Sequence, residues 1–306
     1  MCIEISAVIC THNRAQYLRK ALASLCTQTL EKDRYEILVV DNASTDETAT
    51  VVQHEYAEAA NLRYLFEPEL GLSVARNAGA RLAKAPYIAY LDDDAIADSQ
   101  WLENSLSVFH LPGLNVGIIG GPIRPIWESP RPTWLPDHLL PSLTILDPQR
   151  PAGVIDDTQR IYGANLLVSR RAFDAAGGFN ANLGRKGSSL MSSEETALRS
   201  LIVAAGFVAY FDPAVIVHHH VPSQRLQRGW FYRRAYWQGR SQAVVFSAGS
   251  PGTVQRLLKA GQTVNSLLRL AISILLGVFR PNRTASWFFG KKCGIWRQLG
   301  LLKGLL

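Results

Sequence analysis

The chain has 306 residues, of which 47% are hydrophobic and 19% are charged, and its formal net charge is +7. A chain of this length can bury a full core, and its composition excludes an intrinsically disordered or fibrous protein. Residues 1–212 hold 18 basic and 25 acidic side chains, for a net charge of −7, whereas residues 213–306 hold 14 basic side chains and no acidic one. A segment with a net charge of +14 indicates an anionic partner, either a membrane surface or a nucleic acid.

The N-terminal stretch MCIEISAVIC is typical of a first strand, since it has neither the basic start nor the apolar core of a signal peptide. We therefore expect the chain to remain in the cytosol. The cysteines show neither CxxC pairing nor the spacing of a metal site, and three of the four fall in stretches expected in the core. Such thiols are expected to be reduced and structural. The four are Cys2, Cys10, Cys26 and Cys293.

Strand-like and helix-like stretches alternate over the first 98 residues. This alternation predicts an α/β fold with a mostly parallel sheet and helices on both faces. In such a sheet, ligands bind outside the carboxyl ends of the strands. We expect the strands at 5–10, 35–41, 62–67 and 87–92, and the helices at 15–25, about 45–59 and 73–84.

Beyond Asp98 the pattern is less regular. Residues 128–142, ESPRPTWLPDHLLPS, are typical of a mobile loop that shapes a substrate pocket. From Leu226 onward the sequence is basic and favours helices. We expect a strand within 113–127, a strand and a helix within 164–179, a helix at 192–206, and a strand broken at Pro213 within 207–221.

Three of the predicted strands end in polar residues, with the sequences THNR, DNAST and DDD. The carboxyl ends of parallel strands meet at one edge of a sheet, so we expect these groups to converge. The carboxylates of Asp92, Asp93 and Asp94 repel one another unless a cation or a protonation relieves them. Oxygen ligands suit Mg²⁺ or Mn²⁺, which typically bridge to substrate phosphates. The alternative is a solvated acidic loop or a helix cap.

Several well-known motifs are missing from the sequence. It has no G-x-G-x-x-G after the first strand, no G-x-x-x-x-G-K-[ST] and no G-x-S-x-G. These absences remove the main support for a dinucleotide dehydrogenase, a P-loop enzyme or an α/β-hydrolase. A metal ion on carboxylates then remains as the way to hold a nucleotide diphosphate.

Four stretches, in order, resemble glycosyltransferase family 2 over about residues 3–220: AVICTHNRAQYLRKALASL, ILVVDNASTDET, GLSVARNAGARLAKAPYIAYLDDDA and SSEETALRSLIVAAG. Each stretch alone is weak, but their order and spacing together are specific. The resemblance implies the GT-A fold, a Rossmann-like sheet with helices on both faces. It also implies inverting transfer of a sugar from a nucleotide sugar, with UDP as the expected nucleotide. The metal, Mn²⁺ or Mg²⁺, would bind through a D-x-D motif formed by Asp92 and Asp94.

The same resemblance implies contacts to the nucleotide sugar. The THNR loop matches the first nucleotide-contacting loop of the family. Asp41 matches a uridine or ribose contact, and capping of the next helix is the alternative or additional role. Arg76 matches a basic residue near the nucleotide, and an exposed helix arginine is the alternative. The nucleotide-sugar-binding set is therefore Thr11, Asn13, Arg14, Asp41, Arg76, Asp92 and Asp93.

Inverting transfer needs one base that takes the proton of the acceptor hydroxyl. The family motif that carries this base usually reads Glu-Asp, whereas this sequence reads Glu194-Glu195, with one more methylene at the second position. Glu195 matches the base, and Glu194 stands beside it. The alternative is that both acidic residues complement the dipole at the start of a helix.

The stretch VIVHHHVP ends the resemblance. Many family members have a histidine here as a further metal ligand, and His219 matches it best. Alternation along a strand puts His218 and His220 on the opposite face from His219. A surface histidine cluster without a ligand role is the alternative.

The basic tail contains the apolar stretch NSLLRLAISILLGVF, which Arg269 interrupts. We expect its clean apolar run to be too short to span a bilayer. Two alternatives remain, namely a core helix or a helix in the membrane interface. The flanking stretches RRAYWQGR, FRPNR, WFFGKK and WRQLGLLK combine aromatic and basic residues, which favours an anionic membrane surface. The chain has no recognised nucleic-acid-binding module.

We therefore expect a catalytic domain over residues 1–222, with a nucleotide-sugar half to about 98 and an acceptor half from about 99, and a basic helical extension over 223–306. The expected enzyme transfers a sugar to a saccharide or lipid-linked acceptor in polysaccharide or glycolipid biosynthesis. It would act in the cytoplasm, peripherally on the cytosolic face of the membrane. The alternatives are a catalytically silent nucleotide-sugar-binding protein of a membrane complex and a metal-dependent nucleotidyl or phosphoryl transferase.

Overall fold

The computed structural model describes residues 3–278 and 284–306, so Cys2 and the stretch FRPNR lie outside the described residues. The chain divides into two compact units that interleave along the sequence. The domains expected at 1–222 and 223–306 remain predictions. The first unit, here called the sheet unit, comprises Met1–Ile126, Thr144–Ala181 and Glu194–His220, and the second, the helical unit, comprises Trp127–Leu143, Asn182–Ser193 and Val221–Leu306.

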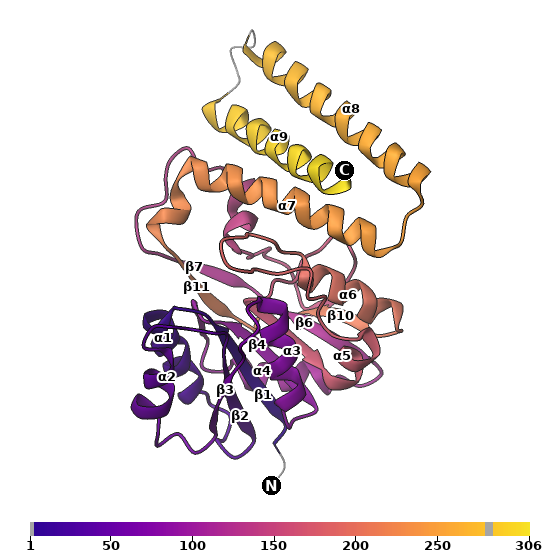
Figure 1. The fold of residues 1–306 in the computed structure, drawn as a ribbon. Helices are drawn as coiled ribbons and strands as arrows, with labels where there is room; N and C mark the ends of the chain where they lie inside the picture. Colours follow the sequence, from indigo (N-terminus) through magenta and orange to yellow (C-terminus); the bar gives the residue numbers. More distant parts are fainter. Residues whose placement is uncertain (1–2, 279–283) are drawn as a thin grey trace. The chain divides into compact units, whose positions relative to one another are not determined.

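The sheet unit is built on an eight-stranded sheet with the strand order β3-β2-β1-β4-β9-β6-β10-β8 (Figure 1). Its first four strands are parallel to one another, whereas β9 runs antiparallel to both of its neighbours. The strands are β1 (Ile5–Thr11), β2 (Tyr35–Asp41), β3 (Leu62–Phe66), β4 (Tyr87–Asp92), β6 (Val116–Gly120), β8 (Gly153–Ile155), β9 (Asn165–Ser169) and β10 (Val208–Phe211).

Helices cover both faces of this sheet, as the alternating pattern predicts. Along β1, Ile5, Ala7 and Ile9 belong to one hydrophobic cluster, whereas Val8 and Cys10 belong to the other. Side chains alternate along a strand, so each cluster lies on one face of the sheet. The helices are α1 (Ala15–Cys26), α2 (Thr48–Thr50) with the turn η1 (Val51–Glu55), α3 (Leu72–Leu82), α4 (Trp101–Phe109), α5 (Arg170–Ala176) and α6 (Glu194–Ala204).

A second, three-stranded sheet places the histidine cluster next to the end of β4. Its strand order is β5-β11-β7. The antiparallel register of β11 on β5 sets His219 opposite Ala95, the residue that follows Asp94. The residues Asp92–Asp94, here called the acidic run, thus become neighbours of His218–His220. The strands are β5 (Ala95–Ala97), β7 (Ile123–Trp127) and β11 (Val217–Val221).

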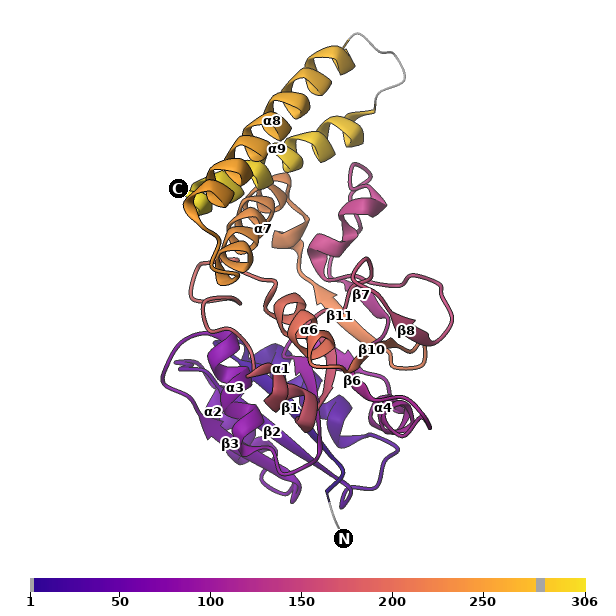
Figure 2. The ribbon, with the colours of Figure 1, turned by 90° about the vertical axis from the view of Figure 1, so that its right-hand side faces the viewer.

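The helical unit consists mainly of three long helices, α7 (Arg228–Ala248), α8 (Thr253–Val278) and α9 (Ala285–Leu305) (Figure 2). Helices α7 and α9 approach closely at two glycines. A Cβ added at Gly239 would lie 1.9 Å from the carbonyl oxygen of Arg297, and one added at Gly300 would lie 1.9 Å from that of Tyr236. Only glycine permits backbones to meet at this distance.

In α9, Phe289 and Leu301 are buried within the helical unit, whereas Trp296 and Leu306 are exposed, so the expected contact with a membrane surface stays a prediction. One expectation about the tail is wrong. The apolar stretch around Arg269 is not too short to span a bilayer, since α8 has 26 residues and meets the length and hydropathy of a spanning helix. Arginine is a good helix former, so Arg269 does not end the helix.

The Pro-rich loop over residues 128–142 is attached to the helices rather than free. The ring of Trp134 packs edge-on against Phe231 and Phe289, with centroid distances of 5.7 and 4.8 Å. Ser286 Oγ donates a hydrogen bond of 3.0 Å to the carbonyl oxygen of Trp134. The short helix η2 (Asp137–Leu143) then ends the loop. Aromatic burial therefore anchors a segment that we expected to be mobile.

Candidate active site

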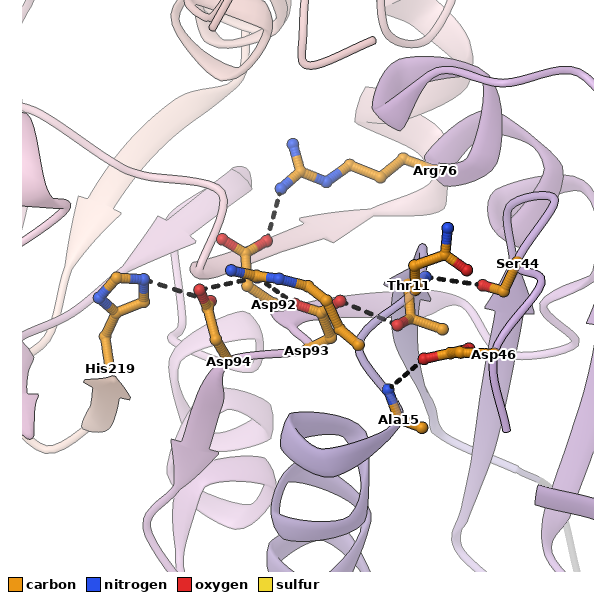
Figure 3. Close-up of polar contacts among 11 residues, drawn as sticks. Thr11, Ala15, Ser44, Asp46, Arg76, Asp92, Asp93, Asp94 and His219 are labelled. Carbon is orange, nitrogen blue, oxygen red and sulfur yellow. Dashed lines mark hydrogen bonds and ion pairs between the residues drawn. The ribbon is translucent and has the colours of Figure 1, made fainter. Parts of the chain in front are cut away.

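The parallel register brings the predicted polar strand ends together. Thr11 pairs with Asp41 across β1 and β2, and Cys10 pairs with Asp92 across β1 and β4. All of these residues lie at the carboxyl edge of the large sheet, and Figure 3 shows Thr11 and Asp92 there. The sequence predicts this convergence correctly, because strand alternation with helices leaves only one edge for these ends.

Arg14 is the counter-charge of the acidic run. Its Nη1 donates hydrogen bonds of 2.7 Å to Asp93 Oδ1 and 2.8 Å to Asp94 Oδ2. Thr11 Oγ1 donates a further bond of 2.8 Å to Asp93 Oδ2. Burial raises the pKa of Asp93 to about 6, and the nearby carboxylate of Asp94 adds to this rise, whereas Arg14 opposes it. Part of the expected repulsion is thus relieved by the protein's own guanidinium.

Asp94 also meets the histidine cluster, as Figure 3 shows. The distance from Asp94 Oδ1 to His219 Nε2 is 3.2 Å, and both side chains are buried. The backbone N–H of His220 donates a hydrogen bond of 2.8 Å to the carbonyl oxygen of Asp94. The ring of His220 contacts Tyr17. The ring of His219 therefore contacts the acidic residues at the end of β4.

Arg76 joins the acidic run to the first turn of α6. Its Nη2 donates a hydrogen bond of 2.9 Å to Asp92 Oδ1, and its Nη1 donates one of 2.9 Å to Glu194 Oε1. The Arg76 side chain is only 3% exposed, so the alternative of an exposed helix arginine is wrong. The guanidinium lies over the ring of Phe179, and a Cβ at Gly163 would come within 2.2 Å of Nη2.

Glu195 is buried at the start of α6, next to this ion pair. Its Oε2 accepts no hydrogen bond from any residue that the structure describes. Burial raises the pKa of Glu195 to about 8, and the neighbouring carboxylate of Glu194 contributes to the rise. A carboxylate with a pKa near neutrality can both take and release a proton under physiological conditions.

The THNR and DNAST loops are tied to each other. Asn13 has a φ of +53°, and its backbone N–H donates a hydrogen bond of 3.0 Å to Ser44 Oγ. The backbone N–H of Thr45 donates one of 2.7 Å to Asn13 Oδ1. His12 Nδ1 lies 2.7 Å from the carbonyl oxygen of Asn42. The two loops thus form one continuous rim beside the acidic run.

Asp41 has a partner that the sequence did not reveal. Tyr64 Oη donates a hydrogen bond of 2.7 Å to Asp41 Oδ2, and the backbone N–H of Ser44 donates one of 2.9 Å to Oδ1. The carboxylate that was expected to contact the nucleotide is therefore also a structural acceptor. Tyr64 lies on the neighbouring strand β3, where it is opposite Val39, so the bond depends on how the two strands pair in the sheet.

The residues expected to hold a metal come from two places, the end of β4 with Asp92 and Asp94, and strand β11 with His219. Within residues 3–278 and 284–306, no three His, Cys, Asp or Glu side chains are grouped so that they could hold an ion. Asp94 and His219 are in contact, whereas Asp92 is turned toward Arg76 and its side chain remains 29% exposed. Two carboxylates and one imidazole are a donor set that Mn²⁺ or Mg²⁺ accepts, so the residues fit such an ion by chemistry.

Known proteins resemble this chain in sequence and in fold. The family model "Glycosyl transferase family 2" matches residues 6–175, which is more than half of the chain. The glucosyl-dolichyl phosphate glucuronosyltransferase of Haloferax volcanii is 25% identical over 247 residues, which are 79% of this chain and 77% of that protein. The succinoglycan biosynthesis protein ExoM of Rhizobium meliloti is 24% identical over 92% of this chain and 89% of its own length.

Solved structures show the same fold at lower identity. The mannosyltransferase PcManGT from Pyrobaculum calidifontis, in complex with GDP-Man and Mn²⁺, has a TM-score of 0.62 and 18% identity over 96% of this chain and 86% of its own. Residues 1–349 of TarS from S. aureus, with UDP-GlcNAc, have a TM-score of 0.58 and 15% identity over 80% of this chain and 67% of that one. The expected GT-A fold with a helical C-terminal extension is thereby confirmed. From the extent of the family match, the chain belongs to glycosyltransferase family 2.

Proposed function

We propose that this glycosyltransferase is a metal-dependent, inverting enzyme that moves a sugar from a UDP-linked donor to a saccharide or lipid-linked acceptor. The observation that carries this proposal is the buried Glu195 next to a guanidinium that also holds the acidic strand end. A base and a site for a departing diphosphate are the two parts that inverting transfer requires.

The names of related proteins support the choice of substrates and pathway. The relatives named above act on a dolichyl phosphate-linked sugar or in succinoglycan biosynthesis. The two solved structures hold a nucleoside diphosphate sugar, one with uridine and one with guanosine. We therefore infer a role in polysaccharide or glycolipid biosynthesis, with UDP preferred on the basis of the contact expected at Asp41.

In the proposed reaction the THNR and DNAST loops bind the nucleotide, and Arg76 stabilises negative charge at the diphosphate. Asp92 and Asp94, with His219, would hold the Mn²⁺ or Mg²⁺, which when bound neutralises charge on the leaving diphosphate. Glu195 Oε2 takes the proton of the acceptor hydroxyl, whose oxygen attacks the anomeric carbon as the bond to the diphosphate breaks. The sugar is inverted because the attack comes from the face opposite the leaving group.

We further propose that α8 attaches the protein peripherally to an anionic cytosolic membrane. The 14 basic residues beyond Asp212 have no acidic residue of the same segment to neutralise them. An anionic leaflet attracts such residues and accepts an apolar helix face beneath its headgroups. Nine large apolar side chains of α8 are exposed: Val254, Leu257, Leu258, Val264, Leu268, Ile272, Leu275, Leu276 and Val278.

Two observations favour a position in the interface over a membrane span. Arg269 is exposed in the second half of α8, and burying a charge at the centre of a bilayer costs at least about 2.5 kcal/mol. At the interface its long side chain reaches the headgroups. Helix α8 also packs on α9. Gly277 of α8 lies against the ring of Trp287, and the side chain of Leu270 in α8 lies against Gly294. A spanning helix would have to leave these contacts.

The Glu195→Gln substitution is predicted to lower the turnover number by about 10² or more and to leave donor affinity near that of the unmodified enzyme, since it keeps the shape and removes the proton acceptor. In the unmodified enzyme the rate should rise with pH up to about 8, because Glu195 must lose its proton to act. Release of nucleoside diphosphate from a panel of nucleotide sugars measures both effects.

The products of this assay also separate the alternatives. Nucleoside diphosphate with transferred or free sugar supports glycosyl transfer, whereas nucleoside monophosphate with sugar phosphate indicates cleavage of the pyrophosphate. Donor binding without turnover indicates a silent binder. A loss of turnover in Glu194→Gln but not in Glu195→Gln would assign the base to Glu194 and contradict the proposal.

The metal assignment predicts that Asp94→Asn abolishes the dependence of donor binding on Mn²⁺. The stabilisation of the protein by nucleoside diphosphate, measured as a thermal shift with and without Mn²⁺, reports this directly through mass action. The control is Asp98→Asn, since among the residues that the structure describes the Asp98 carboxylate accepts a hydrogen bond only from the backbone N–H of Gln100. An unchanged Mn²⁺ effect in Asp94→Asn would show that the metal is held elsewhere.

The membrane assignment predicts binding to vesicles with anionic lipid, loss of most of this binding at high salt, and loss in the double variant Leu268→Ser/Ile272→Ser. Both side chains lie on the exposed face of α8, one turn apart, and Leu201→Ser, at a 50% exposed leucine of α6, is the control. Cosedimentation measures all three. Equal binding to neutral and anionic vesicles, or no binding, would refute the membrane role and leave sugar transfer unaffected.

A further inference from the structure

The carboxylate of Asp41, at the end of β2, is buried and held from two directions. The residue is 2% exposed. The backbone N–H of Ser44 donates a hydrogen bond of 2.9 Å to Oδ1, and Tyr64 Oη donates one of 2.7 Å to Oδ2. Among the residues that the structure describes, these are the two donors to this carboxylate. A carboxylate has about four acceptor positions, so each oxygen keeps one for a ligand.

Tyr64 reaches Asp41 because of the register between β2 and β3. Tyr64 is opposite Val39, whereas Phe66 is opposite Asp41. Side chains alternate along a strand, so Val39, Asp41 and Tyr64 share one face of the sheet. The Tyr64 ring packs against the hydrophobic cluster that contains Val39. The hydroxyl that bonds to Asp41 thus belongs to a side chain that packing holds in place.

The hydroxyl of Tyr64 keeps its proton and acts as the donor. Burial raises the pKa of Tyr64, and the hydrogen bond to Asp41 raises it further. The torsion that turns an aspartate carboxylate about its Cβ–Cγ bond is broad by itself. One hydrogen bond to each oxygen removes this freedom. Tyr64 therefore sets the direction in which the remaining acceptor positions of Asp41 point.

The backbone beside Asp41 is fixed as well. Asn42 Nδ2 donates hydrogen bonds of 3.2 and 2.7 Å to the carbonyl oxygens of Glu67 and Glu69. Asn42 Oδ1 accepts one of 2.7 Å from the backbone N–H of Gly71. The backbone N–H of Glu67 also donates one of 2.8 Å to the carbonyl oxygen of Asp41. Rotation of the carboxylate is the freedom that is then left for Tyr64 to remove.

The nucleotides in the two solved structures named above differ in what they present to a carboxylate. Uracil has one N–H donor, which lies between two carbonyl oxygens that a carboxylate repels. Guanine has two adjacent donors, N1–H and the N2 amino group, which match both oxygens of a carboxylate that can turn to face them. A carboxylate held in one orientation favours the single donor of uracil, because it cannot turn to meet the pair.

We propose that Tyr64 is a positioning residue that makes the nucleotide site prefer uridine to guanosine, by holding the Asp41 carboxylate in one orientation. This inference rests on the nucleotide contact proposed for Asp41. Tyr64 acts through Asp41 and needs no contact of its own with the nucleotide. The preference is thus set by a side chain on the strand next to the one that carries the expected contact.

The substitution Tyr64→Phe keeps the ring and removes the hydroxyl. Dissociation constants for UDP and for GDP follow from thermal shifts at a fixed Mn²⁺ concentration. We expect UDP binding to weaken about tenfold, because the oriented hydrogen bond to a charged group is lost. GDP binding should stay within about twofold, because a carboxylate that can turn meets both guanine donors. The preference for UDP over GDP therefore narrows.

The matched control is Tyr56→Phe. Tyr56 packs against the same hydrophobic cluster as Tyr64, and its Oη donates a hydrogen bond of 2.8 Å to the carbonyl oxygen of Arg19. This variant should keep both dissociation constants. A general loss of structure would weaken the binding of UDP and GDP together. An unchanged UDP-to-GDP ratio in Tyr64→Phe, or the same fall of the ratio in Tyr56→Phe, overturns the proposal.

Asp41→Asn removes the charge that Tyr64 orients and separates two kinds of failure. Adding Tyr64→Phe to Asp41→Asn should change the UDP-to-GDP ratio by less than about twofold, since Tyr64 acts through Asp41. A larger further fall would assign Tyr64 another route and refute the proposal. If Asp41→Asn alone keeps the ratio of the unmodified protein, the nucleotide contact is wrong and the role of Tyr64 fails with it. If Asp41→Asn lowers the ratio and Tyr64→Phe does not, the contact stands and only the role of Tyr64 is refuted.

Discussion

A guanidinium buried in a protein must be paired with carboxylates, because an unpaired charge removed from water is very costly. Arg76 is such a group, with its side chain 3% exposed and its two ion pairs directed to Asp92 and Glu194. These carboxylates come from the end of β4 and the start of α6, which lie far apart in the sequence. The requirement to satisfy one arginine thus brings the acidic strand end and the candidate base into one site.

The rest of the site follows from this pairing. Arg14 pairs with Asp93 and Asp94, whereas Asp92 pairs with Arg76 and its side chain remains 29% exposed. Arg76 forms its ion pair with Glu194 rather than with the neighbouring Glu195. Glu195 is buried beside the Glu194 carboxylate, and both burial and the nearby negative charge raise its pKa.

The features that depend on local sequence patterns could be predicted from the sequence. Strand alternation with helices places Thr11, Asp41 and Asp92 at one edge, and the order of four motifs identifies the family. Tertiary packing decides the rest, namely that Arg76 is buried, that Tyr64 bonds to Asp41, and that Phe289 and Leu301 of α9 are buried. Helix α8 continues through Arg269, because arginine is a good helix former and its charge stays exposed.

The central claim, that Arg76 couples the acidic strand end to the base helix, is tested most directly by a double-mutant cycle in urea unfolding. Arg76→Met should lower the free energy of unfolding by about 3–5 kcal/mol, since it leaves two carboxylates without their partner. Adding Glu194→Gln should return part of this loss, so that the two changes together cost at least about 1 kcal/mol less than the sum of the single changes. Strict additivity, within about 0.3–0.5 kcal/mol, would show that Arg76 and Glu194 are independent and would contradict the account.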